Sequence, residues 1–136
     1  MGRHEQREQI FALLFRVEFN ALEEMPEQIK LFLEDEERGI HKKDAGYISE
    51  KYNKIQEKLP ELDELINQKA EKWDVERMGK VELTVLRLAV YEMLFDDNIP
   101  DGVAINEAVE LAKKYGGENS GAFINAILAK FVKQGD

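Results

Sequence analysis

Apolar residues recur every three or four positions along almost the whole chain, and this helical periodicity most limits the possible folds. Strand-like alternation of apolar and polar residues, bounded by turn residues, is missing. The three prolines, Pro26, Pro60 and Pro100, all stand where a periodic segment begins, a position at which helices accept proline. The pattern therefore predicts an all-α protein of about seven helices.

The expected helices cover most of the sequence. They span about 5–22, from 26 to the glycine at 39, about 43–58, from 60 onwards, about 80–95, and two more within 99–131. The segment 80–95 is apolar on almost every side, which is typical of a central helix packed on several sides. Arg87 and Glu92 within it must be paired if they are buried, because an unpaired buried charge costs several kcal/mol.

At 136 residues the chain is long enough for one domain with its own core. It has no cysteine, which excludes disulfide and thiolate chemistry. The charged first residues do not resemble a signal peptide, and no apolar stretch reaches the roughly eighteen residues of a membrane span. We therefore expect a protein of the cytoplasm without membrane association.

The net charge of −9 argues against a dedicated, high-affinity nucleic-acid binder, but the charge is unevenly placed. Residues 23–64 hold thirteen acidic and seven basic side chains, whereas residues 1–22 are neutral. Screening acts over about 8 Å at physiological salt, so a distant acidic face does not abolish a local basic one. Any RNA affinity is expected to be modest unless a partner adds positive charge.

A catalytic role finds little support. His4 and His41 are the only histidines, and neither shows the spacing of a metal site or lies beside a nucleophile pattern. The glycine pair Gly116–Gly117 lies between two expected helices and not after a strand, so it is no phosphate-binding loop of the dinucleotide type. We expect no catalytic residue, no metal and no cofactor, and hence no enzyme.

The corner between the last two expected helices carries the sharpest candidate site. Gly116 stands where a left-handed C-cap belongs, and Asn119 or Ser120 can cap the next helix. A helix N-terminus attracts a phosphate, and Phe123, one turn further on, can stack on an unpaired base. The alternative is that Phe123 is ordinary core and that Asn119 and Ser120 are plain caps.

Basic side chains supply further candidates for RNA contacts. Arg3 and Arg7 are four residues apart and share a helix face with room for two phosphates, with His4 between them. Lys113 and Lys114 end the sixth expected helix and face outward. The alternative is that the arginines are a solvated first turn and that the lysines simply suit a helix C-terminus.

Three blocks of this sequence resemble the NusB family of bacterial transcription antitermination factors. They are residues 99–128 (IPDGVAINEAVELAKKYGGENSGAFINAIL), residues 79–94 (GKVELTVLRLAVYEML) and, more loosely, the pair Arg3 and Arg7. The resemblance implies a single NusB-like domain over residues 1–136. It consists of two small helical bundles packed across each other, at about 1–59 and 60–136.

The resemblance also implies a function. Family members bind the single-stranded boxA element of ribosomal RNA leaders together with the small-subunit ribosomal protein NusE, and aid assembly on RNA polymerase. Their RNA contacts lie on the first helix and near the last corner, which here correspond to Arg3, His4, Arg7, Lys113, Lys114, Asn119, Ser120 and Phe123. Phe15 and Glu82 match positions that face the protein partner. The competing interpretation of the chain is a helical adaptor between proteins with little or no intrinsic RNA binding. For Phe15, the alternative to a partner contact is burial between the bundles.

Overall fold

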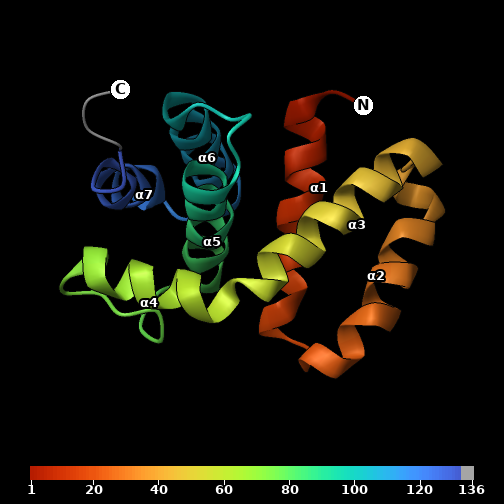
Figure 1. Cartoon of the computed structure of the whole chain (residues 1–136), viewed down its shortest axis with the longest axis horizontal. Helices are drawn as coiled ribbons and strands as arrows, with labels where there is room; N and C mark the ends of the chain where they lie inside the picture. Colours follow the sequence, from red (N-terminus) through yellow and green to blue (C-terminus); the bar gives the residue numbers. More distant parts are fainter. Residues whose placement is uncertain (133–136) are drawn as a thin grey trace. The chain divides into compact units, whose positions relative to one another are not determined.

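The computed structural model describes residues 1–132. Seven α-helices and three single-turn 3₁₀ helices make up most of this range, and no strand occurs within it (Figure 1). The α-helices are α1 (Arg3–Phe15), α2 (Met25–Glu34), α3 (Lys42–Glu57), α4 (Leu59–Ala70), α5 (Lys80–Phe95), α6 (Asp101–Tyr115) and α7 (Ser120–Ala129). The all-α prediction is confirmed, and α3, α4 and α5 each begin within one residue of the expected start.

The chain divides into two compact units, Met1–Gln56 and Glu57–Asp136. The first unit contains α1, α2 and all but the last residue of α3, and the second contains α4 to α7. The family resemblance places this division a few residues later, at about residue 59. Each unit has its own buried apolar side chains.

The first helix is shorter than the sequence predicts, because α1 ends at Phe15 and not near residue 22. The next three residues form a 3₁₀ turn, and the side-chain amide of Asn20 donates to the carbonyl of Arg16 at 2.9 Å. In a continuing α-helix that carbonyl would accept from the backbone N–H of Asn20. Asparagine side chains compete with the backbone in this way, and the helix stops.

The core of the N-terminal unit is built around Phe32, which is almost fully buried. The guanidinium of Arg38 lies 3.9 Å from the Phe32 ring centre and that of Arg16 lies 5.2 Å from it, so the ring is enclosed by two cations. The side-chain amide of Gln6 on α1 donates to Asp44 on α3 at 2.9 Å, and this bond lowers the pKa of that carboxyl. The bond joins the two helices, and α3 passes in front of α1 in Figure 1.

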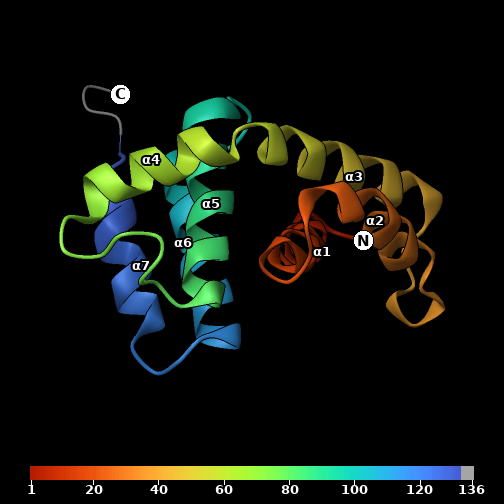
Figure 2. The ribbon, with the colours of Figure 1, turned by 90° about the horizontal axis from the view of Figure 1, so that it is seen from below.

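The C-terminal unit surrounds α5, in which every residue from Leu83 to Met93 is buried. α6 packs against both α5 and α7, and α4 lies across α5 (Figures 1 and 2). The buried Arg87 forms two 2.8 Å hydrogen bonds with Asp63 on α4, which confirms that this arginine is paired. Although α5 is strongly apolar, no helix within residues 1–132 combines the length and hydropathy needed to cross a bilayer.

Tyr52 on α3 gives a test of the packing in the N-terminal unit. Its side chain is fully buried, and its hydroxyl has no hydrogen-bond partner among the described residues. Since an unsatisfied buried hydroxyl costs about 1–3 kcal/mol, we expect Tyr52→Phe to raise the free energy of unfolding at pH 7 by about 1 kcal/mol. Urea denaturation measures this change, and a destabilised variant would contradict it.

The same variant has a pH signature. Burial raises the pKa of Tyr52 to about 12. The unfolded phenol ionises near pH 10, so the raised pKa contributes stability that is present below pH ~10 and lost as the pH rises toward about 12. The difference in free energy of unfolding between Tyr52→Phe and wild type is therefore expected to grow between pH 9 and pH 11.

Candidate nucleic-acid interface

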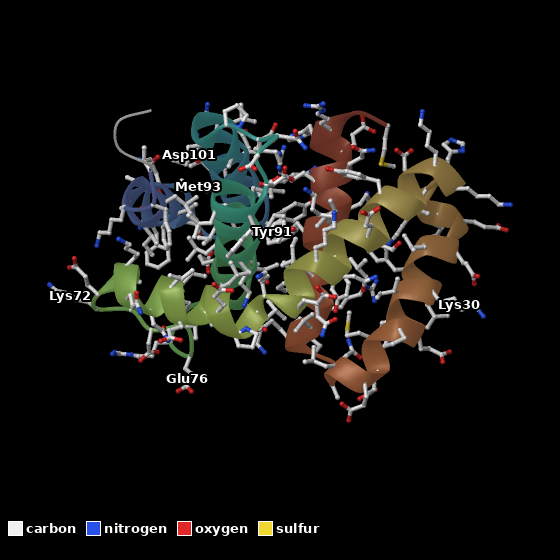
Figure 3. The ribbon with its side chains drawn as sticks, viewed as in Figure 1. Lys30, Lys72, Glu76, Tyr91, Met93 and Asp101 are labelled. Atoms are coloured by element: carbon white, nitrogen blue, oxygen red, sulfur yellow. The ribbon has the colours of Figure 1, made fainter. Side chains whose placement is uncertain are left out.

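A surface pocket of about 410 Å³ lies at the corner between α6 and α7. The α4–α5 loop (residues 71–79) forms one side of it, and Lys72 and Glu76 of this loop point outward from the protein (Figure 3). The lining residues are Trp73, Arg77, Met78, Gly79, Glu82, Gly117, Glu118, Asn119, Ser120 and Phe123. The pocket thus contains Asn119, Ser120 and Phe123, which the sequence assigned to RNA, together with Glu82, which it assigned to the protein partner.

Two aromatic rings form the apolar wall of the pocket. Phe123 is half-buried and meets Trp73 edge to face, with 6.1 Å between the ring centres and 89° between their planes. Trp73 is 48% exposed, and the guanidinium of Arg77 lies 5.9 Å from its ring centre. This pair of rings offers a stacking surface for a flat ligand such as a nucleobase.

Sequence reasoning missed Trp73 and Arg77. Both lie in the loop before α5, where no helical periodicity assigns a face. The available signal was that Trp73 is the only tryptophan of the chain and is followed four residues later by an arginine.

Ser120 holds the corner to the start of α5. Its hydroxyl donates to Glu82 Oε2 at 2.6 Å and accepts from the backbone N–H of Gly117 at 2.9 Å. Ser120 is buried, whereas Glu82 is half-buried in the first turn of α5. Two residues that the sequence placed on separate binding surfaces are therefore directly hydrogen-bonded.

The capping predictions for this corner need correction. Asn119 occupies the N-cap position of α7 and is exposed, but its side chain makes no capping hydrogen bond. The Ser120 hydroxyl accepts from Gly117, which precedes the helix, so it does not cap α7 either. The reason is the nearby Glu82 carboxylate, which orients the serine hydroxyl toward α5.

Gly116 also differs from its prediction. Its backbone is extended, with φ −99° and ψ −170°, and not left-handed. A Cβ atom on this residue would lie 2.5 Å from Ser120 Oγ, 2.7 Å from the carbonyl oxygen of Ala112 and 2.7 Å from Glu82 Oε2. Glycine is required here because three oxygen atoms approach the backbone too closely for any side chain.

The charge of the pocket favours a base over a phosphate. Glu82 and Glu118 contribute two carboxylates to the lining, against the single guanidinium of Arg77. Two carboxylates in the lining repel a phosphate inside the pocket, whereas the aromatic wall accepts an uncharged base. A nucleic-acid backbone would then be held by cations outside the pocket.

Lys113 and Lys114 are exposed at the end of α6. The aliphatic stem of Lys113 lies against Gly121, where an added Cβ would be 3.3 Å from Lys113 Cγ. Lys113 is therefore placed beside the first turn of α7. The ammonium of Lys114 lies 5.4 Å from the ring centre of Tyr115.

The candidates on α1 belong to the N-terminal unit and differ in exposure. Arg3 and His4 are exposed, and the His4 ring lies 4.0 Å from Glu8. Arg7 is only 8% exposed and interacts with other groups of the protein. Arg3 is thus exposed at the start of α1, whereas Arg7, one turn further on, is packed into the structure, and the RNA contact expected of this pair stays a prediction.

Phe15 lies in the middle of an aromatic row. Its ring centre is 6.0 Å from that of the buried Phe11 and 5.1 Å from that of Phe19, which is 60% exposed. Leu22, a few residues further on, is 49% exposed. Phe15 is half-buried, and it lies between the buried Phe11 and the exposed Phe19. Phe19 was not among the residues predicted from the sequence.

Within residues 1–132, no three His, Cys, Asp or Glu side chains gather in a way that could hold a metal ion. The described helices and the aromatic pocket define a small all-helical protein with a surface suited to a flat ligand.

Comparison with known proteins identifies the family. A family model described as NusB matches residues 4–133. The transcription antitermination protein NusB of Agathobacter rectalis is 52% identical over 132 residues, which cover 97% of this chain and 100% of that protein. The chain belongs to the NusB family.

Solved structures show the same fold. T. maritima NusB matches with a TM-score of 0.84 at 39% identity, covering 98% of this chain and 92% of that one. A crystal structure of the antitermination factors NusB and NusE in complex with dsRNA contains a chain that matches with a TM-score of 0.82 at 28% identity. That match covers 95% of this chain and 94% of the other.

The close approach at Gly116 can be tested by one added methyl group. We expect Gly116→Ala to lower the free energy of unfolding by about 1–3 kcal/mol, because the carbonyl of Ala112 cannot move away cheaply. Gly117→Ala is the matched control, since its Cβ would lie 3.9 Å from Ser120 Oγ, an ordinary contact. Urea denaturation of both variants checks this, and equal stabilities would contradict the proposed constraint.

Proposed function

We propose that this chain is a transcription antitermination factor that binds boxA-type single-stranded RNA of ribosomal RNA leaders together with the ribosomal protein NusE. It aids assembly on RNA polymerase in the cytoplasm and catalyses no reaction. The observation that carries the proposal is the aromatic pocket at the α6–α7 corner in a chain 52% identical to a transcription antitermination protein. The match to a NusB chain solved with NusE and dsRNA supports the choice of NusE and of RNA as partners.

RNA binding divides between the pocket and exposed basic side chains outside it. An unpaired base stacks on Trp73 and Phe123, a contact worth about 1–3 kcal/mol per base. Lys113 and Lys114 on α6, and Arg3 and His4 on α1, attract phosphates from exposed positions. Because the net charge of the whole chain, −9, opposes RNA, the affinity is modest and strongly salt-dependent.

The protein partner engages an apolar surface of the N-terminal unit and the carboxylate of Glu82, which also lines the pocket. Phe15, Phe19 and Leu22 present apolar area on the N-terminal unit, and an exposed aromatic is a common anchor at protein interfaces. Glu82 offers a carboxylate for a basic side chain of the partner. Joint engagement of RNA and partner raises the affinity above that of either surface alone.

The second candidate is an adaptor between proteins with little intrinsic RNA binding. The observations that favour it are the buried state of Arg7 and the two carboxylates in the pocket lining. Both reduce the positive charge available to a nucleic acid. The two candidates differ in whether the chain binds RNA at all.

Removing the exposed tryptophan ring tests the RNA site. We expect Trp73→Ala to weaken binding of a labelled boxA RNA by about fivefold or more, the lower range for loss of one stacked base. Phe95→Ala is the control, because Phe95 is an exposed aromatic (36%) in the same unit that does not line the pocket, and the cation beside it is Lys58, which is not a proposed RNA contact. Fluorescence anisotropy in the presence of NusE measures both. If wild-type protein binds no RNA with or without NusE, the adaptor interpretation replaces this one.

The apolar surface of the N-terminal unit has its own test. We expect Phe19→Asp to abolish capture of NusE while leaving the melting temperature nearly unchanged, because this side chain is 60% exposed. Tyr47→Asp on α3 is the control, since Tyr47 is an exposed aromatic (42%) outside the proposed surface. If neither variant loses NusE binding, the partner surface lies elsewhere on the protein.

A further inference from the structure

The loop that carries Trp73 is tied to the end of α7 by one lysine. Lys130 follows α7 directly and keeps a helical backbone. Its ammonium donates to the backbone carbonyl of Lys69 at 2.9 Å and lies 3.1 Å from the carboxylate of Glu71. Lys69 is in the last turn of α4, where carbonyls lack partners inside the helix, and Glu71 is the first residue of the loop. The lysine therefore joins α7 to the point where the loop begins.

The chain turns sharply at Glu71. Its φ of 54° makes it the one non-glycine residue with a positive φ within residues 1–132. Such a conformation is disfavoured for a residue with a side chain, and it persists only where surrounding contacts hold it. The ion pair with Lys130 is a contact of this kind, because the Glu71 side chain itself makes it. The direction in which the loop leaves α4 thus depends on Lys130.

α7 also meets the loop at a second point, two turns earlier. Phe123 contacts Trp73 edge to face, with 6.1 Å between the ring centres. Phe123 and Lys130 are seven residues apart, which is close to two full helical turns, so they share a face of α7. The loop runs alongside this helix (Figure 2). Because Trp73 follows Glu71 by only two residues, a shift of the backbone at Glu71 moves the tryptophan ring.

We propose that Lys130 is a positioning residue for base stacking, which holds the start of the loop so that Trp73 stays against Phe123. The inference rests on the proposed function, which places an unpaired base on these two rings. Lys130 does not line the pocket, so its effect on RNA passes through the loop. Rings that are already in place need no ordering when the base arrives, and this raises the affinity.

Removal of the ammonium tests the positioning. Lys130→Met keeps an aliphatic side chain and loses both contacts. Trp73 is the only tryptophan of the chain, so quenching of its emission by acrylamide reports its exposure without any ligand. We expect this quenching to rise in Lys130→Met. Binding of labelled boxA RNA in the presence of NusE is expected to weaken about two- to fivefold, the upper part of the range for an exposed ion pair.

Two variants serve as matched controls. Lys130→Arg keeps the charge and the donors, and we expect it to retain wild-type quenching and RNA affinity. Lys69→Met removes a positive charge from the same end of α4 but leaves the backbone carbonyl that Lys130 uses. We expect its quenching to equal that of wild type. Melting curves verify that each variant is folded.

The salt dependence separates positioning from a direct contact with phosphate. A lysine that binds a phosphate of single-stranded RNA contributes about 0.7 to the slope of log affinity against log salt. A positioning residue leaves this slope unchanged, because it neutralises no phosphate. We therefore expect equal slopes for wild type and Lys130→Met, and a slope reduced by about 0.7 would overturn the inference.

The remaining outcomes separate the inference from the proposed function. Unchanged Trp73 quenching in Lys130→Met overturns the inference, whatever the RNA affinity. Raised quenching with wild-type RNA affinity overturns it as well. If wild-type protein binds no RNA with or without NusE, the proposed function fails and the inference fails with it. The two failures are distinguishable, because the quenching is measured on the free protein.

Discussion

The C-terminal unit depends on the burial of α5 on all sides. Eleven consecutive residues, Leu83 to Met93, are buried, so each turn of this helix needs a neighbour. α4, α6 and α7 supply those neighbours, and the polar groups of α5 must find partners within the same packing. Arg87 does so through two hydrogen bonds with Asp63. The position of the pocket follows, because the pocket lies where the first turn of α5 meets the α6–α7 corner.

Close packing at that corner explains why small residues and a carboxylate occur together. Gly79 and Gly116 leave space for Glu82, and Glu82 orients the hydroxyl of Ser120. The site is therefore preorganised by contacts that involve no ligand, which lowers the entropy lost on binding. The aromatic pair Trp73 and Phe123 adds a surface suited to a base, while phosphates are left to the exposed cations.

Helix identity was largely predictable from the sequence, since apolar periodicity and proline positions depend on local geometry. The misplaced end of α1 shows the limit of this reasoning. Val17, Ala21 and Leu22 continue the apolar spacing, but the Asn20 side chain takes the carbonyl that the next turn needs. The spacing of apolar residues predicts which face of a helix is buried. It does not predict where a single side-chain hydrogen bond ends the helix.

The sequence by itself determined the helical class, the family resemblance and the corner at Gly116–Phe123 as a candidate site. Only the tertiary structure decided what that corner contains. It brought Trp73 and Arg77 from a loop forty and more residues upstream, joined Ser120 to Glu82 and buried Arg7. The physical reason is that helical spacing is set by near neighbours along the chain. Burial, hydrogen-bond partners and the charge of a pocket are set by residues distant in sequence.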